Sequence, residues 1–256
     1  MCDSLTRILE VKNLTKSFGR LVALNEISLG LEEKSISILI GPNGSGKTTL
    51  LNVVAGFYHP DSGSVEYKST NITGQPPHKI YKMGIARTFQ IPALFWKLTV
   101  LENMLVAERQ NPGEYFGKAI FPRFWKREEE QAIDKAKHVL ETIGLVEHWN
   151  KPAQLLSGGQ MKLLELGRAL MADASLLLVD EPISGINPTL AHEIFSRIVR
   201  LRDELGLSFL IVEHRLDIAM DYVDHMIAMA LGQLIASGRP DQVVNDTRVV
   251  EAYLGK

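Results

Sequence analysis

The sequence has few cysteines, no long apolar run and little net charge. Its 256 residues include one cysteine, Cys2, which excludes an internal disulfide and favours a reducing compartment. No apolar run approaches the roughly 18–20 residues that cross a bilayer, and no signal-like segment opens the chain. The formal net charge of -2 gives no basic field of the kind that holds nucleic acid. We therefore expect a cytoplasmic protein without a nucleic acid partner, and other chains would have to supply any part that crosses a membrane.

A complete phosphate-loop motif is the strongest feature that the sequence does contain. GPNGSGKT, at 41–48, fills every fixed position of G-x-x-x-x-G-K-[ST]. A β-branched run at 35–40 precedes it and a helical pattern at 48–54 follows, which is the strand–loop–helix context that the motif requires. Backbone N–H groups and the helix N-terminus attract phosphate, Lys47 would reach the β- and γ-phosphates, and Thr48 would ligate Mg²⁺. The sequence therefore predicts a nucleoside triphosphate site rather than an ordinary glycine-rich turn.

The pattern of predicted secondary structure changes along the chain. The first third predicts strands at 8–12, 27–31 and 64–67, the last as an edge element. After Leu156, helices at 160–171, 189–205 and 216–222 alternate with apolar strands at 176–179 and 209–212, which indicates a buried parallel sheet. The residues from 91 to 156 do not follow this alternation of strands and helices. We expect one domain, 1–256, in which 1–90 and 157–256 form the core with an N-terminal β part, and 91–156 form a helical insertion.

Two carboxylates follow the predicted strand at 176–179. Asp180 would sit at the sheet edge where ligands bind in such folds, and would share the Mg²⁺ shell with Thr48. Glu181 would point to the other face and polarise a water for attack on the γ-phosphate. The plainer interpretation is a pair of exposed acids at a strand end, which the four apolar residues before them disfavour.

The segment LSGGQ, at 156–160, is a second candidate phosphate site. Ser157 is a suitable N-cap for the helix that follows, and a capped helix start also offers N–H groups and a positive dipole to an anion. The phosphate loop already binds the phosphates of one nucleotide. A second phosphate-binding segment in the same chain would therefore have a role if it bound the nucleotide held by another copy. This pattern favours a dimer that sandwiches ATP.

These motifs, taken in order, resemble the ATP-binding subunit of an ABC transporter along nearly the whole chain. The resemblance implies an α/β fold, namely a P-loop NTPase (RecA-like) core with an N-terminal antiparallel β subdomain and an inserted α-helical subdomain. Nucleotide contacts are implied for Phe18, Gly41, Pro42, Asn43, Gly44, Ser45, Gly46, Lys47, Thr48, Thr49, Ser157, Gly158, Gly159 and Gln160. Catalytic roles are implied for Glu181, His214 and Gln90, and Mg²⁺ contacts for Thr48, Gln90 and Asp180.

Within this superfamily, the segment GIARTFQ at 84–90 and the tail EAYLGK at 251–256 are similar to ATPases of branched-chain (hydrophobic) amino acid uptake systems. That resemblance implies an ATPase that pairs on ATP with a second ATPase subunit, works through membrane permeases at the inner face of the membrane, and is served indirectly by a solute-binding protein. The alternatives are the ATPase of a lipid or lipopolysaccharide exporter, or a soluble ABC protein in DNA repair or translation. A simple phosphate-loop kinase is disfavoured by LSGGQ.

Several segments leave alternatives open. The aromatic stretch 111–126 either packs on the helical insertion or faces a partner, and Phe95 and Trp96 are either core residues or part of a permease contact. Asn187 stands where relatives of the wider superfamily carry Asp at the subunit contact. Lys34 occupies a hairpin where relatives usually have glycine, so that turn is expected to be distorted. The transported solute is not readable, because the ATPase does not touch it.

Overall fold

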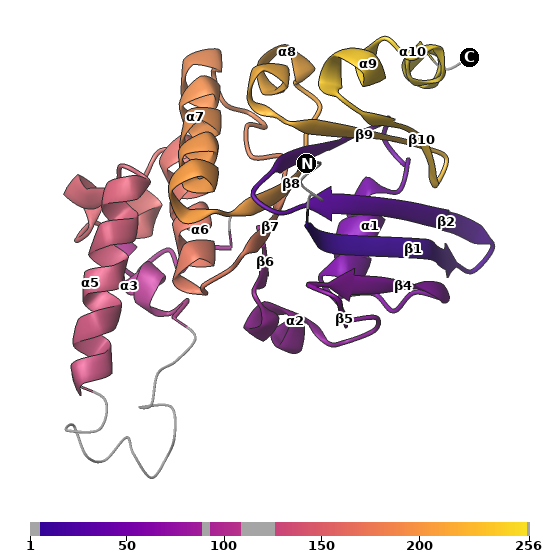
Figure 1. Cartoon of the computed structure of the whole chain (residues 1–256). Coiled ribbons are helices and arrows are strands. Elements are labelled where there is room, and N and C mark those ends of the chain that lie inside the picture. The colour runs from indigo at the N-terminus through magenta and orange to yellow at the C-terminus, as the bar shows by residue number, and fades with distance from the viewer. Residues whose placement is uncertain (1–5, 89–92, 109–125, 255–256) are drawn as a thin grey trace, which may run out of the picture. The chain divides into compact units, whose positions relative to one another are not determined.

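The computed structural model describes residues 6–88, 93–108 and 126–254, and the chain forms two compact units (Figure 1). The first unit comprises Met1–Gln90 with Ser175–Lys256, and the second comprises Ile91–Ala174. We expected the chain to return to the core at 157, whereas it rejoins the first unit at Ser175. The reason for the difference is packing, since helix α6 (Gly158–Met171) contacts the helices α3 (Val100–Leu105) and α5 (Lys126–Thr142) of the second unit.

The first unit contains two sheets and their covering helices. Its strands are β1 (Arg7–Phe18), β2 (Leu21–Glu32), β3 (Ile36–Ile40), β4 (Ser62–Tyr67), β5 (Thr70–Asn71), β6 (Ile85–Arg87), β7 (Leu176–Asp180), β8 (Ser208–Val212), β9 (His225–Ala230) and β10 (Gln233–Gly238). Its helices are α1 (Lys47–Val54), α2 (Pro77–Met83), α7 (Pro188–Leu205), α8 (Leu216–Ala219), the 3-10 turn η5 (Met220–Tyr222), α9 (Pro240–Val244) and α10 (Thr247–Leu254).

One sheet is antiparallel, in the order β2-β1-β4-β5. The strands β1 and β2 form a long hairpin. The alternation that the sequence indicated holds at 27–31 of β2, whereas in β1 Ile8 and Leu9 are both buried and the pairing shifts register. The prediction of β4 as an edge strand was wrong, because β4 pairs with β1 on one side and with the short β5 on the other. The two residues of β5 lie close in sequence to β4 and contain no apolar run, so the sequence did not predict a strand there.

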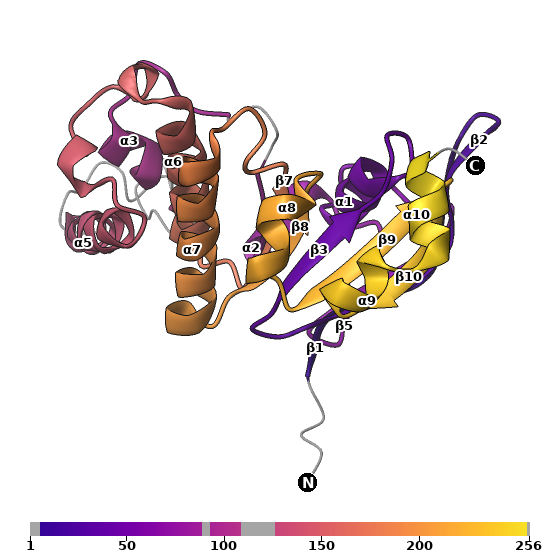
Figure 2. The same cartoon turned by 90° about the horizontal axis from the view of Figure 1, so that it is seen from above.

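The other sheet has six strands in the order β10-β9-β3-β8-β7-β6. The pairs from β9 to β6 are parallel, and β10 adds an antiparallel edge. The fully buried strands β3, β7 and β8 confirm the predicted parallel sheet. Seen from above, α9 and α10 lie beside β9 and β10 (Figure 2).

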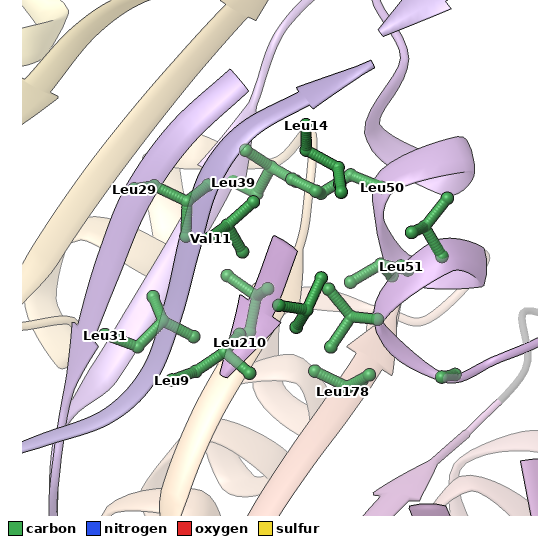
Figure 3. Packing of buried hydrophobic residues seen from close by; sticks show 14 of the residues in the cluster. Leu9, Val11, Leu14, Leu29, Leu31, Leu39, Leu50, Leu51, Leu178 and Leu210 are labelled. Carbon is green, nitrogen blue, oxygen red and sulfur yellow. The ribbon is translucent and has the colours of Figure 1, made fainter. Parts of the chain in front are cut away.

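A shared core joins the two sheets of the first unit (Figure 3). Leu9 and Val11 of β1, Leu50 of α1 and Leu178 and Leu210 of the parallel strands belong to one buried cluster. Burial of this apolar surface fixes α1 against both sheets. The phosphate loop, which joins β3 to α1, is therefore anchored at both of its ends.

The second unit is helical. Besides α3, α5 and α6 it has the 3-10 turns η3 (Val146–His148) and η4 (Ala153–Leu155). The charge run before residue 131 forms the first turn of α5, with Glu128 and Glu129 near its N-terminus as expected. Within the ranges that the structure describes, no helix is long and apolar enough to cross a bilayer. The aromatic stretch 111–125 lies outside the described residues.

The turn before the phosphate-loop strand keeps a defined shape. Lys34 takes a left-handed backbone conformation with φ 54, which is the conformation that a glycine adopts without steric cost. Its N–H donates to Ser208 Oγ at 2.8 Å, and Ser35 Oγ donates to the Glu32 carbonyl at 2.8 Å. The two side-chain hydrogen bonds hold the turn, so Lys34 carries backbone strain in place of a distorted hairpin.

Candidate functional site

A pocket of about 390 Å³ opens in the first unit at the carboxyl end of β3. It is lined by Phe18, Leu21, Val22, Ala23, Asn43, Gly44, Gly46, Lys47, Thr48, Thr49, Glu181, Val212, His214 and Leu231. The pocket thus brings together residues of the phosphate loop, the acidic loop after β7 and the loop after β8. Chain segments separated by more than a hundred positions converge here because β3 and β8 are neighbours in the sheet.

Lys47 lies inside the phosphate loop. Its ammonium donates to the carbonyls of Gly41 and Pro42 at 2.8 and 2.9 Å and contacts Ser45 Oγ at 3.3 Å. Burial lowers the pKa of Lys47, while the charges of Glu181 and Asp180 act in the opposite direction. A charged donor held in this position is suited to bind phosphate oxygens.

Two glycines of the loop allow its close packing. At Gly41, φ is 149 and a Cβ would lie 2.1 Å from the Met229 carbonyl oxygen. Gly46 is the N-cap of α1, with φ 102, and a Cβ there would lie 2.5 Å from the Ala23 carbonyl oxygen. In the described chain no side chain caps α1 and no acid lies in its first turn. The start of this helix therefore presents N–H groups and a positive dipole to an anion.

Asp180 ends β7, the strand end at which the sequence placed it, and is buried. Its Oδ2 lies 3.3 Å from Nη2 of Arg87, whose Nη1 donates to Asn52 Oδ1 at 2.5 Å. Arg87 therefore links the acidic strand end to α1. We did not predict this role for Arg87, because the pairing of β6 with β7 brings it to Asp180 across a long stretch of sequence.

Glu181 and His214 face each other at the mouth of the pocket. Nε2 of His214 lies 3.3 Å from Oε1 of Glu181. The backbone of Glu181 has φ 49, a conformation that is uncommon for residues other than glycine and turns the chain sharply after β7. Glu181 and His214, two of the three residues for which the resemblance implied a catalytic role, thus come within contact distance of one another.

Glu213 fixes the loop that carries His214. It is 2% exposed and accepts hydrogen bonds from the N–H groups of Ile183, His214 and Arg215 at 2.9, 3.0 and 3.4 Å. Burial raises the pKa of Glu213, and these backbone donors partly oppose that effect. Sequence reasoning missed this residue, because a glutamate beside a histidine carries no signal of its own.

The opposite wall of the pocket is apolar. Phe18 ends β1, is 43% exposed and packs edge-on against Tyr58, with ring centroids 5.2 Å apart. Leu21 and Leu231, which sequence reasoning did not select, extend this wall from the start of β2 and from the β9–β10 turn. An exposed aromatic ring with aliphatic neighbours is suited to stack against a flat heterocycle.

The segment LSGGQ at 156–160, which we call the signature segment, belongs to the second unit. Ser157 caps α6, its Oγ accepting from the Gln160 N–H at 3.3 Å while Gln160 Oε1 accepts from the Ser157 N–H at 2.9 Å. This reciprocal capping box confirms Ser157 as the N-cap, although the helix begins at Gly158 rather than at 160. Gln160 Nε2 also lies 2.8 Å from His148 Nε2. Gln90 lies outside the described residues.

Asn187 has a structural role in the loop that follows Glu181. It is the N-cap of α7, and its Oδ1 accepts from the Leu190 N–H at 3.0 Å. Asparagine and aspartate serve this position about equally well. The asparagine therefore preserves the helix start without adding a charge.

The donor set at the pocket fits a small divalent cation that is held largely by phosphates and water. Thr48 lines the pocket with its hydroxyl. Asp180 does not line the pocket but ends β7, which β8 separates from β3, and its charge acts on Lys47. In the described ranges there is no cluster of three or more His, Cys, Asp or Glu side chains that would cage a metal by itself. Mg²⁺ is commonly bound through one or two protein ligands together with substrate phosphates and water.

The fold and the pocket define a phosphate-loop ATPase of the ATP-binding cassette class. A family model described as ABC transporter matches residues 24–184, and one described as branched-chain amino acid ATP-binding cassette transporter matches residues 233–256. The chain belongs to the ABC transporter family, and within it to the branched-chain amino acid transport ATP-binding proteins. It is therefore a member of a family of ATPases.

Full-length relatives and solved structures agree with this assignment. The chain is 50% identical to the probable branched-chain amino acid transport ATP-binding protein LivG of Archaeoglobus fulgidus, with 97% of this chain and 96% of that protein covered. It is 38% identical to the high-affinity LivG of Escherichia coli, with 97% and 98% covered. A nucleotide-free ATP-binding cassette from an ABC transporter superposes with a TM-score of 0.86 at 43% identity, covering 98% of this chain and all of that one. An ADP-bound cassette gives 0.85 at 42% identity, with 98% and 100% covered.

Proposed function

We propose that this protein is the ATP-hydrolysing subunit of an importer for branched-chain (hydrophobic) amino acids. The observation that carries the proposal is that Phe18, Lys47, Glu181 and His214 all line one pocket. The proposal places the chain in the cytoplasm, attached to the inner face of the membrane through permease subunits. A solute-binding protein outside the membrane would deliver the amino acid to those permeases.

Each pocket residue has a defined task in this proposal. Phe18 stacks on the base, Lys47 and the loop N–H groups hold the β- and γ-phosphates, and Glu181 takes the proton of the attacking water. Thr48, Asp180 and Gln90 would hold Mg²⁺, which would neutralise charge on the phosphates. Positioning and charge stabilisation are sufficient for phosphoryl transfer to water, so no covalent intermediate with the protein is needed.

ATP would also join two copies or two related subunits. Each chain carries one phosphate loop and one signature segment, so a head-to-tail pair makes two equivalent composite sites. Lys47, Asp180 and Glu181 are polar groups that would be poorly satisfied at a dry interface without ligand. The triphosphate supplies their partners, and its hydrolysis and release would open the pair again.

The second unit offers exposed aromatic rings for a permease. Phe95 and Trp96 are 47% and 45% exposed, so packing in the core of their unit is not their role, whereas the neighbouring Leu94 is 6% exposed and buried. Arg168 lies over the Phe95 ring, 5.4 Å from its centroid. Introducing a cysteine at the exposed Lys97 should give crosslinks to a cognate permease, and a cysteine at buried Leu94 should not.

Transport itself tests the proposal. The chain would be reconstituted with its cognate permeases in liposomes, together with the matching solute-binding protein and labelled leucine, isoleucine or valine. We expect ATP-dependent accumulation with the wild-type chain and none with Glu181→Gln. ATP-dependent release of a lipid or lipopolysaccharide instead would support the exporter alternative, and ATPase activity that no membrane subunit alters would support a soluble role.

A further inference from the structure

The C-terminal helix of the chain contacts the phosphate loop. The Gly41 N–H donates to Tyr253 Oη at 2.8 Å, across 212 positions of sequence. Tyr253 belongs to α10, near the end of the segment that the branch-specific family model matches. Among the proposed catalytic and binding steps, none uses this side chain.

Helix α10, which carries Tyr253, is packed against other elements of the first unit. Val249 is 4% exposed, and α10 contacts both α9 and β10 (Figure 2). The Asp246 carboxylate accepts from the Arg248 N–H at 2.9 Å and pairs with the Arg248 guanidinium at 2.7 Å, which defines the start of the helix. The tyrosine hydroxyl is therefore presented to the loop from an ordered element and not from a free tail.

Gly41 is held on both sides of its backbone. Its N–H is bound by Tyr253, and its carbonyl accepts from the Lys47 ammonium at 2.8 Å. The residue also packs so closely on the Met229 carbonyl that no Cβ fits. Movement of Gly41 would therefore shift the carbonyl that positions Lys47.

The chemistry of the phenol suits a permanent contact. Burial raises the pKa of Tyr253 above its ordinary value, and the Gly41 N–H acts in the opposite direction. The hydroxyl thus stays neutral through the physiological range, with lone pairs to accept from the amide. This burial is partial, because Tyr253 is 44% exposed, and Leu254, the next residue, is 66% exposed.

We infer that Tyr253 is a positioning residue for nucleotide binding: its hydroxyl fixes the first peptide of the phosphate loop and couples the C-terminal segment to that loop. The inference rests on nucleotide binding at the phosphate loop, as proposed above. A loop fixed before the ligand arrives loses less conformational freedom on binding. Tyr253 therefore acts on affinity for ATP and not on the hydrolytic step.

Two substitutions separate the hydroxyl from the ring. Tyr253→Phe removes only the acceptor, and Tyr253→Ala removes the ring as well. Because a net hydrogen bond contributes on the order of a fivefold change in an equilibrium constant, we expect both variants to raise KM for ATP by about that factor. The kcat value should stay within about twofold, since the loss weakens binding of the ground state and of the transition state equally. Leu254→Ala, on the same helix, is the matched control and should behave as the wild type.

Amide exchange gives a readout that does not need ATP. In wild type the Gly41 amide should exchange slowly, and in Tyr253→Phe it should exchange faster while the amides of β3 keep their protection. A Tyr253→Phe protein with wild-type KM and wild-type Gly41 exchange would overturn the inference. A wild-type protein that binds no ATP would instead overturn the proposed function, whatever the exchange data show.

Discussion

Glu181 is the residue whose replacement separates binding of the nucleotide from its hydrolysis. Its Oε1 lies beside Nε2 of His214, whereas the phosphate loop is built from other residues. Glu181→Gln keeps the size of the side chain but removes the base, so we expect ATP binding to persist and hydrolysis to fall by about 10²–10⁴-fold. Gel filtration with ATP should then show a lasting dimer. Hydrolysis at the wild-type rate would refute the role of Glu181.

The proposed stacking of Phe18 on the base makes a prediction about nucleotide affinity. An aromatic stack contributes roughly 0.5–1.5 kcal/mol beyond burial, so Phe18→Ala should weaken ATP affinity by about 2- to 12-fold. The ring does not read the base edge, and GTP should therefore bind with similar strength. Titration calorimetry checks both expectations. Phe95→Ala, which removes an equally exposed ring from the second unit, is the control and should leave the affinity unchanged.

At the scale of elements, Glu213 joins the loops that follow β7 and β8. Its two oxygens accept from Ile183 on one loop and from His214 and Arg215 on the other. In Glu213→Gln an NH₂ group must face at least one of these N–H donors, which costs about 1–3 kcal/mol of stability. We expect a lower melting temperature and a slower ATPase, with ATP binding retained. A variant that melts lower yet hydrolyses ATP at the wild-type rate would show that Glu213 does not position His214.

The turn between β2 and β3 makes a prediction about stability alone. Lys34 has φ 54, and a left-handed residue with a Cβ costs roughly 1–2 kcal/mol, of which glycine's greater freedom in the unfolded chain offsets about 0.5–1. Lys34→Gly should therefore raise the free energy of unfolding by up to about 1.5 kcal/mol. Glu33→Gly, at the neighbouring position without positive φ, should lower it. Denaturant titration of both variants shows whether each substitution raises or lowers the free energy of unfolding.

At the scale of the whole molecule, the proposed dimer predicts complementation between defective chains. Lys47→Ala impairs the phosphate loop and Ser157→Arg impairs the signature segment, so neither variant should dimerise on ATP by itself. A mixed pair keeps one intact composite site, formed by the phosphate loop of the Ser157→Arg chain and the signature segment of the Lys47→Ala chain. We expect the mixture to regain part of the ATP-driven dimerisation. Full ATPase activity of Ser157→Arg alone, or strong dimers without ATP, would contradict shared sites.

Local chemistry explains what could be predicted. The phosphate loop, the capped start of α6 and the buried strands β7 and β8 are specified by residues adjacent in sequence, whose spacing alone gives their conformation. The same holds for Asp180 and Glu181, because a strand end places its next residues at the sheet edge. The position of β4 in its sheet and the extent of the helical unit were misjudged, since both depend on which elements pack together.

The sequence by itself determined the class of the protein and predicted the residues that would meet the nucleotide, because short motifs with a fixed local geometry carry both. Only the tertiary structure decided which residues support them. Arg87 reaches Asp180, Glu213 reaches Ile183 and Tyr253 reaches Gly41 through contacts between segments distant in sequence. Such contacts leave no periodic or motif signal in the chain. They exist because strand order and helix packing place a donor and an acceptor within about 3 Å, and one sequence read alone does not give that distance.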